Sequence, residues 1–94
     1  MTIQELKQQL ENRFPGIKIC GSAAEFDEDN NAEGLWVSGE EGTHKGMPIF
    51  DYYVEDFKET TYTLGILNEV YEFLSNNNFF AEAQDPGTYM IWRV

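Results

Sequence analysis

The sequence predicts a single α+β domain, residues 1–94, in which two helices pack on one face of a mostly antiparallel sheet. A chain of 94 residues is long enough for one hydrophobic core and too short for two. Two segments repeat apolar residues with the period of a helix, and five short segments rich in β-forming residues lie between turn residues. The predicted order is α-β-β-β-α-β-β, with no internal repeat and no linker between domains.

The first helix is predicted over residues 3–14. Thr2 and Glu5 have the spacing of a capping box, in which each side chain accepts a hydrogen bond from the other residue's free backbone N–H. Pro15 and Gly16 end the helix, because proline cannot continue it and glycine turns the chain. The apolar residues recur at steps of three and four positions and form one stripe: Ile3, Leu6, Leu10 and Phe14.

Three strands are expected in the first half of the chain, over residues 17–20, 34–38 and 47–54. Residues 21–33 are acidic and rich in turn residues, so we expect a loop there. The segment 39–46 contains three glycines, which is typical of a hairpin connection.

A second helix is expected over residues 62–75, with one apolar half and one polar half. Gly65 is a local weakness in this helix or a point of close approach. Residues 76–78 are three asparagines, which tolerate the left-handed conformation that ends a helix. The apolar half has seven members: Leu64, Ile66, Leu67, Val70, Tyr71, Phe73 and Leu74.

The chain ends in a predicted hairpin of two strands, residues 79–83 and 88–93. The turn between them contains Asp85, Pro86 and Gly87. Proline presets φ at the second position of such a turn, and glycine accepts a positive φ at the third. The two strands are therefore expected to lie side by side in the sheet.

The chain is strongly acidic, with 17 acidic and 6 basic residues and a formal net charge of −11. Such a surface repels nucleic acids and anionic lipids, so direct binding of DNA, RNA or a membrane surface is disfavoured. Most of the charge lies in residues 25–59. This segment has two lysines and eleven acids: Glu25, Asp27, Glu28, Asp29, Glu33, Glu40, Glu41, Asp51, Glu55, Asp56 and Glu59.

The cellular compartment is indicated by the single cysteine, Cys20, which excludes an internal disulfide and suits a reducing environment. The N-terminal segment is a polar helix without the basic and apolar regions of a signal peptide. No apolar stretch approaches the roughly 20 residues of a membrane-spanning helix. We therefore expect a cytoplasmic protein.

Residues 27–33 begin like a calcium-binding loop, because side chains that carry oxygen recur at alternate positions. The sixth position of such a loop is normally glycine and here is Ala32, and the twelfth is normally glutamate and here is Ser38. A calcium site is therefore an alternative to a solvated acidic loop, and no other cofactor is expected. Its ligands would be Asp27, Asp29, Asn31 and Glu33.

The chain lacks a recognisable catalytic set, so we do not expect an enzyme. His44 is the only histidine, and a histidine base needs a nucleophile and an orienting acid within hydrogen-bond distance. Nothing in the sequence places Cys20 or Ser22 beside it, so we expect an exposed loop histidine. The cysteine is expected to be buried, or else to share the exposed face of Lys18. Asp51 lies between aromatic residues, and strand alternation is consistent with a solvent-exposed position for it.

Aromatic residues are interleaved with acids between residues 50 and 62. Carboxylates pair with arginine and aromatic rings stack under guanidinium groups, so this region is complementary to a basic protein surface. A dense acidic ridge also fits a groove meant for phosphates, which makes a nucleic-acid-binding protein the expected partner. The residues expected to bind it are Glu40, Glu41, Asp51, Tyr52, Glu55, Asp56, Phe57 and Glu59.

Two other interpretations of the acidic, aromatic surface stay open. Acidity keeps many small proteins in solution without any partner. Exposed aromatic side chains would also allow a structural subunit to associate with copies of itself.

In size, acidity and lack of a catalytic set, the chain is similar to small accessory proteins of bacteriophages and mobile elements. Some of those proteins inhibit host enzymes by imitating the charge of DNA, which implies a basic protein partner. No motif carries this likeness, so it assigns a role to no residue.

Overall fold

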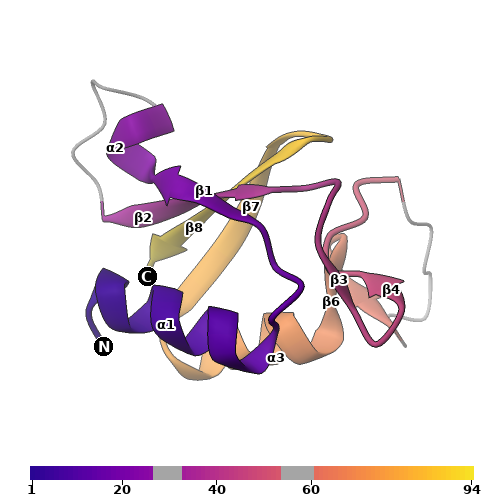
Figure 1. Cartoon of the computed structure of the whole chain (residues 1–94), viewed down its shortest axis with the longest axis horizontal. Helices are drawn as coiled ribbons and strands as arrows, with labels where there is room; N and C mark the ends of the chain where they lie inside the picture. Colours follow the sequence, from indigo (N-terminus) through magenta and orange to yellow (C-terminus); the bar gives the residue numbers. More distant parts are fainter. Residues whose placement is uncertain (27–32, 54–60) are drawn as a thin grey trace.

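The computed structural model describes residues 1–26, 33–53 and 61–94, and its centre is a four-stranded antiparallel sheet (Figure 1). In spatial order the strands are β1 (Ile19–Ser22), β2 (Gly34–Ser38), β8 (Thr88–Arg93) and β7 (Phe79–Asp85). β2 pairs with β8 along its whole length, and β8 pairs with β7 through the C-terminal hairpin. The predicted α+β class with a mostly antiparallel sheet is confirmed.

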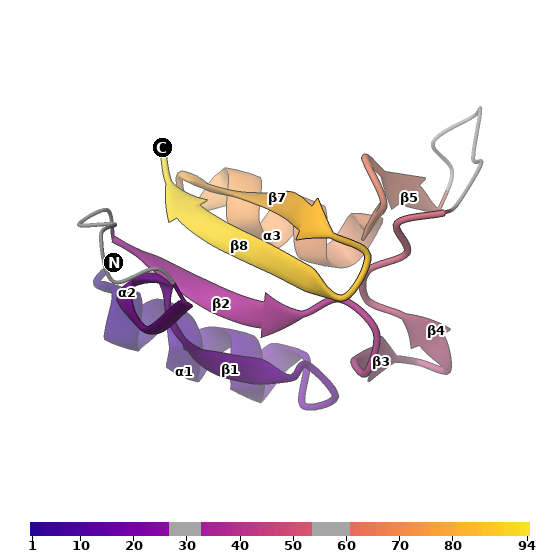
Figure 2. The same cartoon turned by 90° about the horizontal axis from the view of Figure 1, so that it is seen from above.

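Two helices, α1 (Ile3–Arg13) and α3 (Asn68–Asn76), lie on the same face of this sheet (Figures 1 and 2). The capping box of α1 is confirmed. Glu5 N–H donates to Thr2 Oγ1 and Thr2 N–H donates to Glu5 Oε1, both at 3.1 Å. α1 ends one residue earlier than predicted, and Phe14 follows it with a buried ring.

The hydrophobic core lies between the two helices and the sheet. α1 contributes Leu6 and Leu10, and α3 contributes Val70 and Leu74. Alternate residues of the sheet complete the core, because successive strand side chains point to opposite faces. These core-facing residues are Leu35, Val37, Phe79, Tyr89 and Ile91.

The face of the sheet opposite α1 and α3 carries the other set of strand residues. In one row across the strands, Met90 of β8 lies between Trp36 of β2 and Glu82 of β7. In another row, Trp92 lies between Gly34 and Phe80. A Cβ at Gly34 would lie 2.7 Å from the Trp92 ring, so only glycine leaves room for that indole. A third helix, α2 (Ala23–Phe26), contacts β1 and β2 and replaces part of the loop expected over 21–33.

Two short hairpins lie at the end of the molecule that also holds the β7–β8 turn (Figures 1 and 2). β3 (Thr43–His44) pairs with β4 (Met47–Pro48), so the glycine-rich segment forms a hairpin of its own. The strand predicted over 47–54 is wrong in extent. Beyond β4, Phe50 makes a single bridge to Ile66. Ile49 and Phe50 are both buried in the core, so strict alternation fails there, and Val54 lies outside the described residues.

The second hairpin, β5 (Tyr62–Thr63) with β6 (Ile66–Leu67), occupies the first part of the helix predicted over 62–75. Leu64 and Gly65 form its turn with φ of 54° and 78°, which is incompatible with a right-handed helix. A Cβ at Gly65 would lie 2.9 Å from the Asp51 carbonyl oxygen, so this glycine is a point of close approach. α3 therefore begins only at Asn68, and Asn78 ends the segment with the predicted left-handed conformation, φ 64°.

The remaining differences are local. The strand predicted over 17–20 begins two residues later, at Ile19, and Ile17 is buried ahead of it. The C-terminal hairpin is confirmed: β8 has the predicted bounds, and β7 extends two residues closer to the turn than predicted. Positive φ among the glycines of the described residues occurs only at 46 and 65, so Gly87 does not adopt the positive φ expected of it. Asp85 Oδ1 instead accepts a hydrogen bond from the Gly87 N–H at 2.9 Å, which closes the turn.

Candidate functional site

The acidic residues expected to bind a partner are only partly within the described residues. Glu40 and Glu41 follow β2 and are exposed. Asp51 is half-buried, whereas the Tyr52 side chain next to it is 52% exposed and that of Tyr53 is 75% exposed. The other predicted binding residues lie outside the described residues: Glu55, Asp56, Phe57 and Glu59.

The buried side chain of Tyr89 links the segment of Glu40 to that of Asp51. A Cβ at Gly39 would lie 2.8 Å from one edge of the Tyr89 ring, and a Cβ at Gly65, which packs on Asp51, would lie 3.2 Å from the Tyr89 hydroxyl. Phe50 stacks on the ring at 4.3 Å between centroids. Burial, with the nearby charge of Asp51 and then Tyr52, raises the pKa of Tyr89. The two predicted acidic segments therefore flank one side chain of β8.

Asp85 is a member of this surface that the sequence did not identify. The Gly39 N–H donates to the Gly87 carbonyl at 3.0 Å, which fixes the β7–β8 turn beside the end of β2. A Cβ at Gly87 would lie 3.5 Å from the Glu40 carboxyl carbon and 3.6 Å from Asp85 Oδ1. We call Glu40, Glu41, Asp51 and Asp85, with the exposed Tyr52 and Tyr53, the acidic tip.

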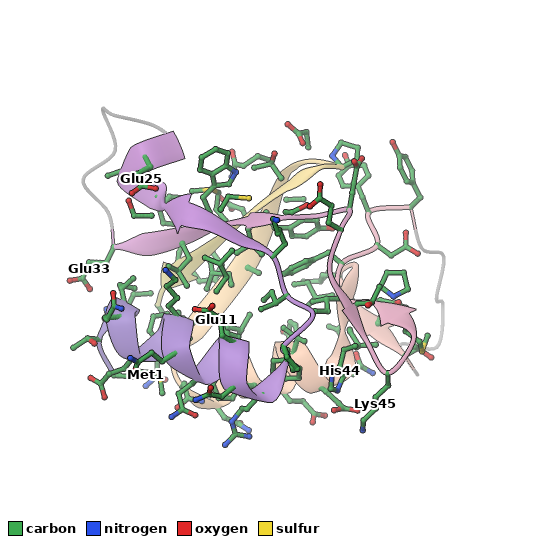
Figure 3. The ribbon with its side chains drawn as sticks, in the orientation of Figure 1. Met1, Glu11, Glu25, Glu33, His44 and Lys45 are labelled. Atoms are coloured by element: carbon green, nitrogen blue, oxygen red, sulfur yellow. The ribbon has the colours of Figure 1, made fainter. Side chains whose placement is uncertain are left out.

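Most basic residues of the described chain are engaged with groups outside the acidic tip. Figure 3 shows His44 and Lys45 near one end of the molecule and Glu33 near the other. The described ion pairs are Lys18–Glu41 at 4.0 Å, His44–Glu69 at 3.0 Å, Lys45–Glu69 at 3.1 Å and Arg93–Glu33 at 2.7 Å. Within the described ranges, no cation pairs with the carboxylates of Glu40, Asp51 or Asp85. The acidic tip thus keeps charge that a basic partner would neutralise.

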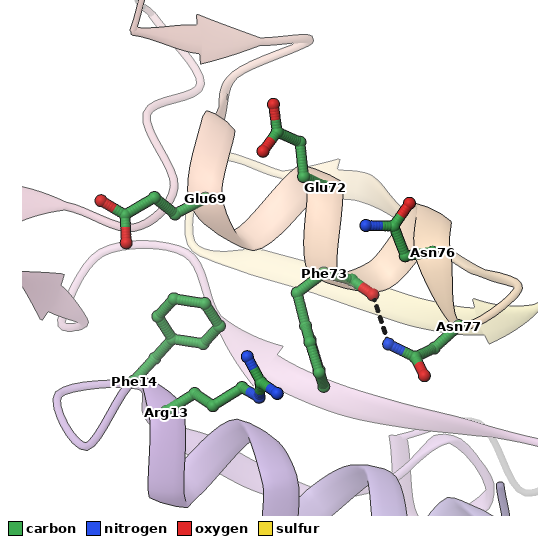
Figure 4. Close-up of a pocket in the computed structure, with 7 residues that line it drawn as sticks. All are labelled: Arg13, Phe14, Glu69, Glu72, Phe73, Asn76 and Asn77. Carbon is green, nitrogen blue, oxygen red and sulfur yellow. Dashed lines mark hydrogen bonds between the residues drawn. The ribbon is translucent and has the colours of Figure 1, made fainter.

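A cleft of about 550 Å³ separates the end of α1 from α3 (Figure 4). Several of its polar groups are engaged within the fold. The Arg13 guanidinium lies 4.9 Å from the centre of the Phe73 ring, and Asn77 Nδ2 donates to the Phe73 carbonyl at 2.8 Å. Hydrogen bonds from Lys45 and then His44 lower the pKa of the Glu69 carboxyl, which keeps it ionised and paired. The cleft therefore offers less free charge to a ligand than the acidic tip does.

The expectation for His44 is wrong, and of the two positions expected for Cys20 the structure agrees with the exposed one. The His44 side chain is 14% exposed and packs edge-on against the Phe14 ring at 5.0 Å, so it is not an exposed loop histidine. Cys20 is exposed, which agrees with the alternative that it shares the face of Lys18. Ser22 Oγ accepts from the Glu25 N–H in the turn into α2. The contacts of His44 in the described chain thus connect it to a glutamate and a ring.

The residues of the predicted calcium loop are mostly outside the described residues, namely Asp27, Asp29 and Asn31. Glu33, the fourth predicted ligand, is described, and its Oε2 accepts from Arg93 Nε at 2.7 Å. In the part of the chain that the structure describes, no three His, Cys, Asp or Glu side chains lie close enough together to hold a metal ion.

Comparisons with known proteins give no functional assignment, since no family model, curated protein or solved structure matches the chain. None of the described helices is long and apolar enough to cross a membrane.

Proposed function

We propose that this protein is a non-enzymatic interaction protein that binds a basic protein surface through its acidic tip and the rest of the acidic 25–59 segment. The observation that carries the proposal is that three carboxylates of the acidic tip form no ion pair within the described residues. They belong to Glu40, Asp51 and Asp85, and two exposed tyrosines, Tyr52 and Tyr53, follow Asp51 directly.

The chemistry of the acidic tip is suited to arginine and lysine side chains. A carboxylate accepts paired hydrogen bonds from a guanidinium group, and a tyrosine ring is a stacking surface for the same group. A nucleic-acid-binding protein is the partner class we propose, because its binding groove already carries the complementary cations. The proposed setting is the cytoplasm, which a single exposed cysteine supports.

The test is capture of basic proteins from a lysate by the immobilised chain at about 50 and about 300 mM salt. We expect capture of basic, nucleic-acid-binding proteins that is lost at the higher salt concentration. Glu40→Lys with Glu41→Lys should abolish the capture, because it replaces two carboxylates of the acidic tip by cations. Both side chains are exposed, so the substitutions should not disturb the core.

The matched control reverses two exposed acids away from the acidic tip, Glu11→Lys with Glu72→Lys, and so changes the net charge by the same amount. This control should retain most of the capture. Equal loss in both double variants would show that only net charge matters. Capture that is insensitive to salt, or no basic protein captured at all, would refute the proposed function.

A further inference from the structure

The outer edge of β7 is an unpaired sheet edge in the described structure. β7 is the last strand in the sheet order, with α3 behind it (Figure 2). The Val94 N–H donates to the Asn78 carbonyl at 2.9 Å, and the register pairs Phe79 with Arg93. Residues 78 and 94 are therefore a hydrogen-bonded pair of the ladder. Such pairs alternate with non-hydrogen-bonded pairs along an antiparallel ladder, so the backbone groups of residues 80 and 82 also face β8. Those of Phe79, Ala81 and Ala83 face outward.

Among the residues that the structure describes, this edge lacks several of the usual protections against pairing with another chain. Proteins commonly block such edges with lysine, proline, bulges or a covering segment. β7 runs for seven residues, Phe79–Asp85, without a lysine or a proline, and its one irregularity lies at the turn end, between Ala83 and Asp85. No backbone or side-chain group in the described residues bonds to the outward N–H and C=O groups of Phe79, Ala81 and Ala83.

An apolar groove of about 300 Å³ runs beside the same edge. Tyr71 and Leu74 of α3 form one wall, and Phe79 and Ala81 of β7 form the other. On the opposite face of the sheet Phe80 is 43% exposed. An added strand would therefore direct alternate side chains into the groove and the others toward Phe80 and Glu82.

We propose that the edge of β7 binds an extended basic segment of a partner protein as a fifth strand of the sheet. Charge complementarity identifies this occupant. β7 contains Glu82 and Asp85 and no basic residue, and Glu40 of the acidic tip lies beside its turn end. The bound segment carries lysine or arginine on the side of Phe80 and Glu82, and apolar residues on the side of the groove.

A second copy of this chain is a poorer occupant of the edge. Each copy has a net charge of −11, so two copies repel each other at long range. The register that pairs Ala81 of one copy with Ala83 of the other also places two Glu82 side chains opposite each other, and like charges in that position are destabilising. The inference rests on the proposed function, because it specifies the form in which a basic partner is bound.

The experiment uses a fluorescent, end-blocked peptide of about nine alternating valine and lysine residues, long enough to span β7. Its affinity for the intact chain is measured by fluorescence anisotropy. Two further peptides carry N-methyl groups, one on the backbone nitrogens of the lysines and the other on those of the valines. Each keeps the charge of the parent peptide and loses the N–H donors along one of its two edges. We expect one of these two methylated peptides to bind at least about tenfold more weakly than the parent.

A variant of the protein tests the same bonds from the other side. Ala81→Pro removes an outward N–H and leaves the bonds to β8 intact, because proline is tolerated on the free side of an edge strand. It should weaken the peptide about tenfold, whereas the matched variant Ala81→Val, which keeps the N–H, should bind like the parent chain. If Ala81→Pro fails to fold, as judged by circular dichroism, the methylated peptides decide alone.

Three outcomes overturn the inference: no binding of the parent peptide at low salt, equal binding of parent and both methylated peptides at low salt, and a dimer of this chain that forms through the same edge at low salt, where repulsion between copies is not screened. The proposed function fails in a different way. Binding that depends on the edge but not on salt or on Glu40 and Glu41 would refute the acidic tip. Binding that depends on salt and those residues but not on the edge would refute only the fifth strand.

Discussion

Replacement of Leu64 by asparagine should stabilise the protein, although it removes a large apolar side chain. Leu64 has a φ of 54° and is 80% exposed, so it holds a left-handed conformation and buries little surface. That conformation costs an ordinary residue about 1 to 2 kcal/mol, and asparagine tolerates it. Asn-Gly is also the preferred pair for a two-residue turn with positive φ at both positions. We expect Leu64→Asn to raise the free energy of unfolding by about 1 kcal/mol.

The assay is urea unfolding followed by circular dichroism, supported by the melting temperature. A gain of about 1 kcal/mol corresponds to a rise of about 4 to 8 °C for a domain of this size. The sign of the change separates two structures. If residues 62–75 formed the continuous helix that their periodicity favours, asparagine would be a poorer helix former than leucine and would destabilise the chain by about 0.5 kcal/mol. A lower urea midpoint for Leu64→Asn would therefore refute the β5–β6 hairpin.

Lys45→Asn is the matched control, since Lys45 has the same φ of 54° and also precedes a glycine. Its Nζ donates to Glu69 Oε1 at 3.1 Å, and the substitution removes that ion pair. We therefore expect a smaller gain at this position than at Leu64. An equal gain at both would mean that the ion pair does not contribute to stability.

Two further predictions follow from local contacts, and a third concerns the acidic segment 27–33. Thr2→Ala should lower the free energy of unfolding by about 1 kcal/mol, because it removes the hydroxyl that accepts the Glu5 N–H; an unchanged urea midpoint would contradict the capping box. Burial raises the pKa of Tyr62 and of Tyr89 above the ordinary value of 10.0, so the contribution of these two groups to stability should be complete below about pH 10 and be lost as the pH rises through the folded-state values. Tyr89→Phe should flatten this alkaline loss in pH-dependent urea titrations, and an unaltered slope would contradict the assignment. Calcium binding by the 27–33 loop would give heat in calorimetric titration that Asp27→Asn with Asp29→Asn removes, and a parent chain that gives no heat ends that alternative.

Features that depend on neighbouring residues were predictable from the sequence. The capping box of α1 is complete within four residues, and Leu6 and Leu10 follow from the period of one helix. The C-terminal hairpin was predictable because its turn residues lie between two β-forming segments. Even there, the positive φ expected at Gly87 is absent, and the turn is closed by a hydrogen bond that the Gly87 N–H donates to Asp85 Oδ1.

The β5–β6 hairpin was not predictable, because contacts from elsewhere in the chain stabilise it. Leu64, Ile66 and Leu67 have the spacing of a helix face, and only Gly65 contradicts that pattern. In the fold, the Asp51 N–H donates to the Gly65 carbonyl at 2.8 Å and Phe50 bridges to Ile66. Tertiary contacts therefore override the local helical preference. The same contacts place both Ile49 and Phe50 in the core, which strand alternation does not allow.

The candidate site shows the same limit. Glu40 and Glu41 were predictable as exposed acids after a strand, but Asp85 is far from them in the sequence. The two segments meet because β2 pairs with β8, and no local pattern specifies which strands become neighbours. His44 likewise contacts Phe14 and Glu69, which are far from it in the sequence, so no local pattern predicts these contacts.

The acidic charge of the chain offers a reason why the edge of β7 can stay unpaired. A long edge without lysine or proline would ordinarily pair with a second copy of the chain. Here Glu82 lies in the edge, Asp85 ends it, and every copy carries the same net charge of −11. The charge that repels identical chains would also attract the proposed basic strand, so the same residues would account for both effects. Salt weakens both effects, since the screening length falls to about 3 Å at 1 M. High salt should therefore release a basic partner and, in the same titration, promote self-association through the exposed edge.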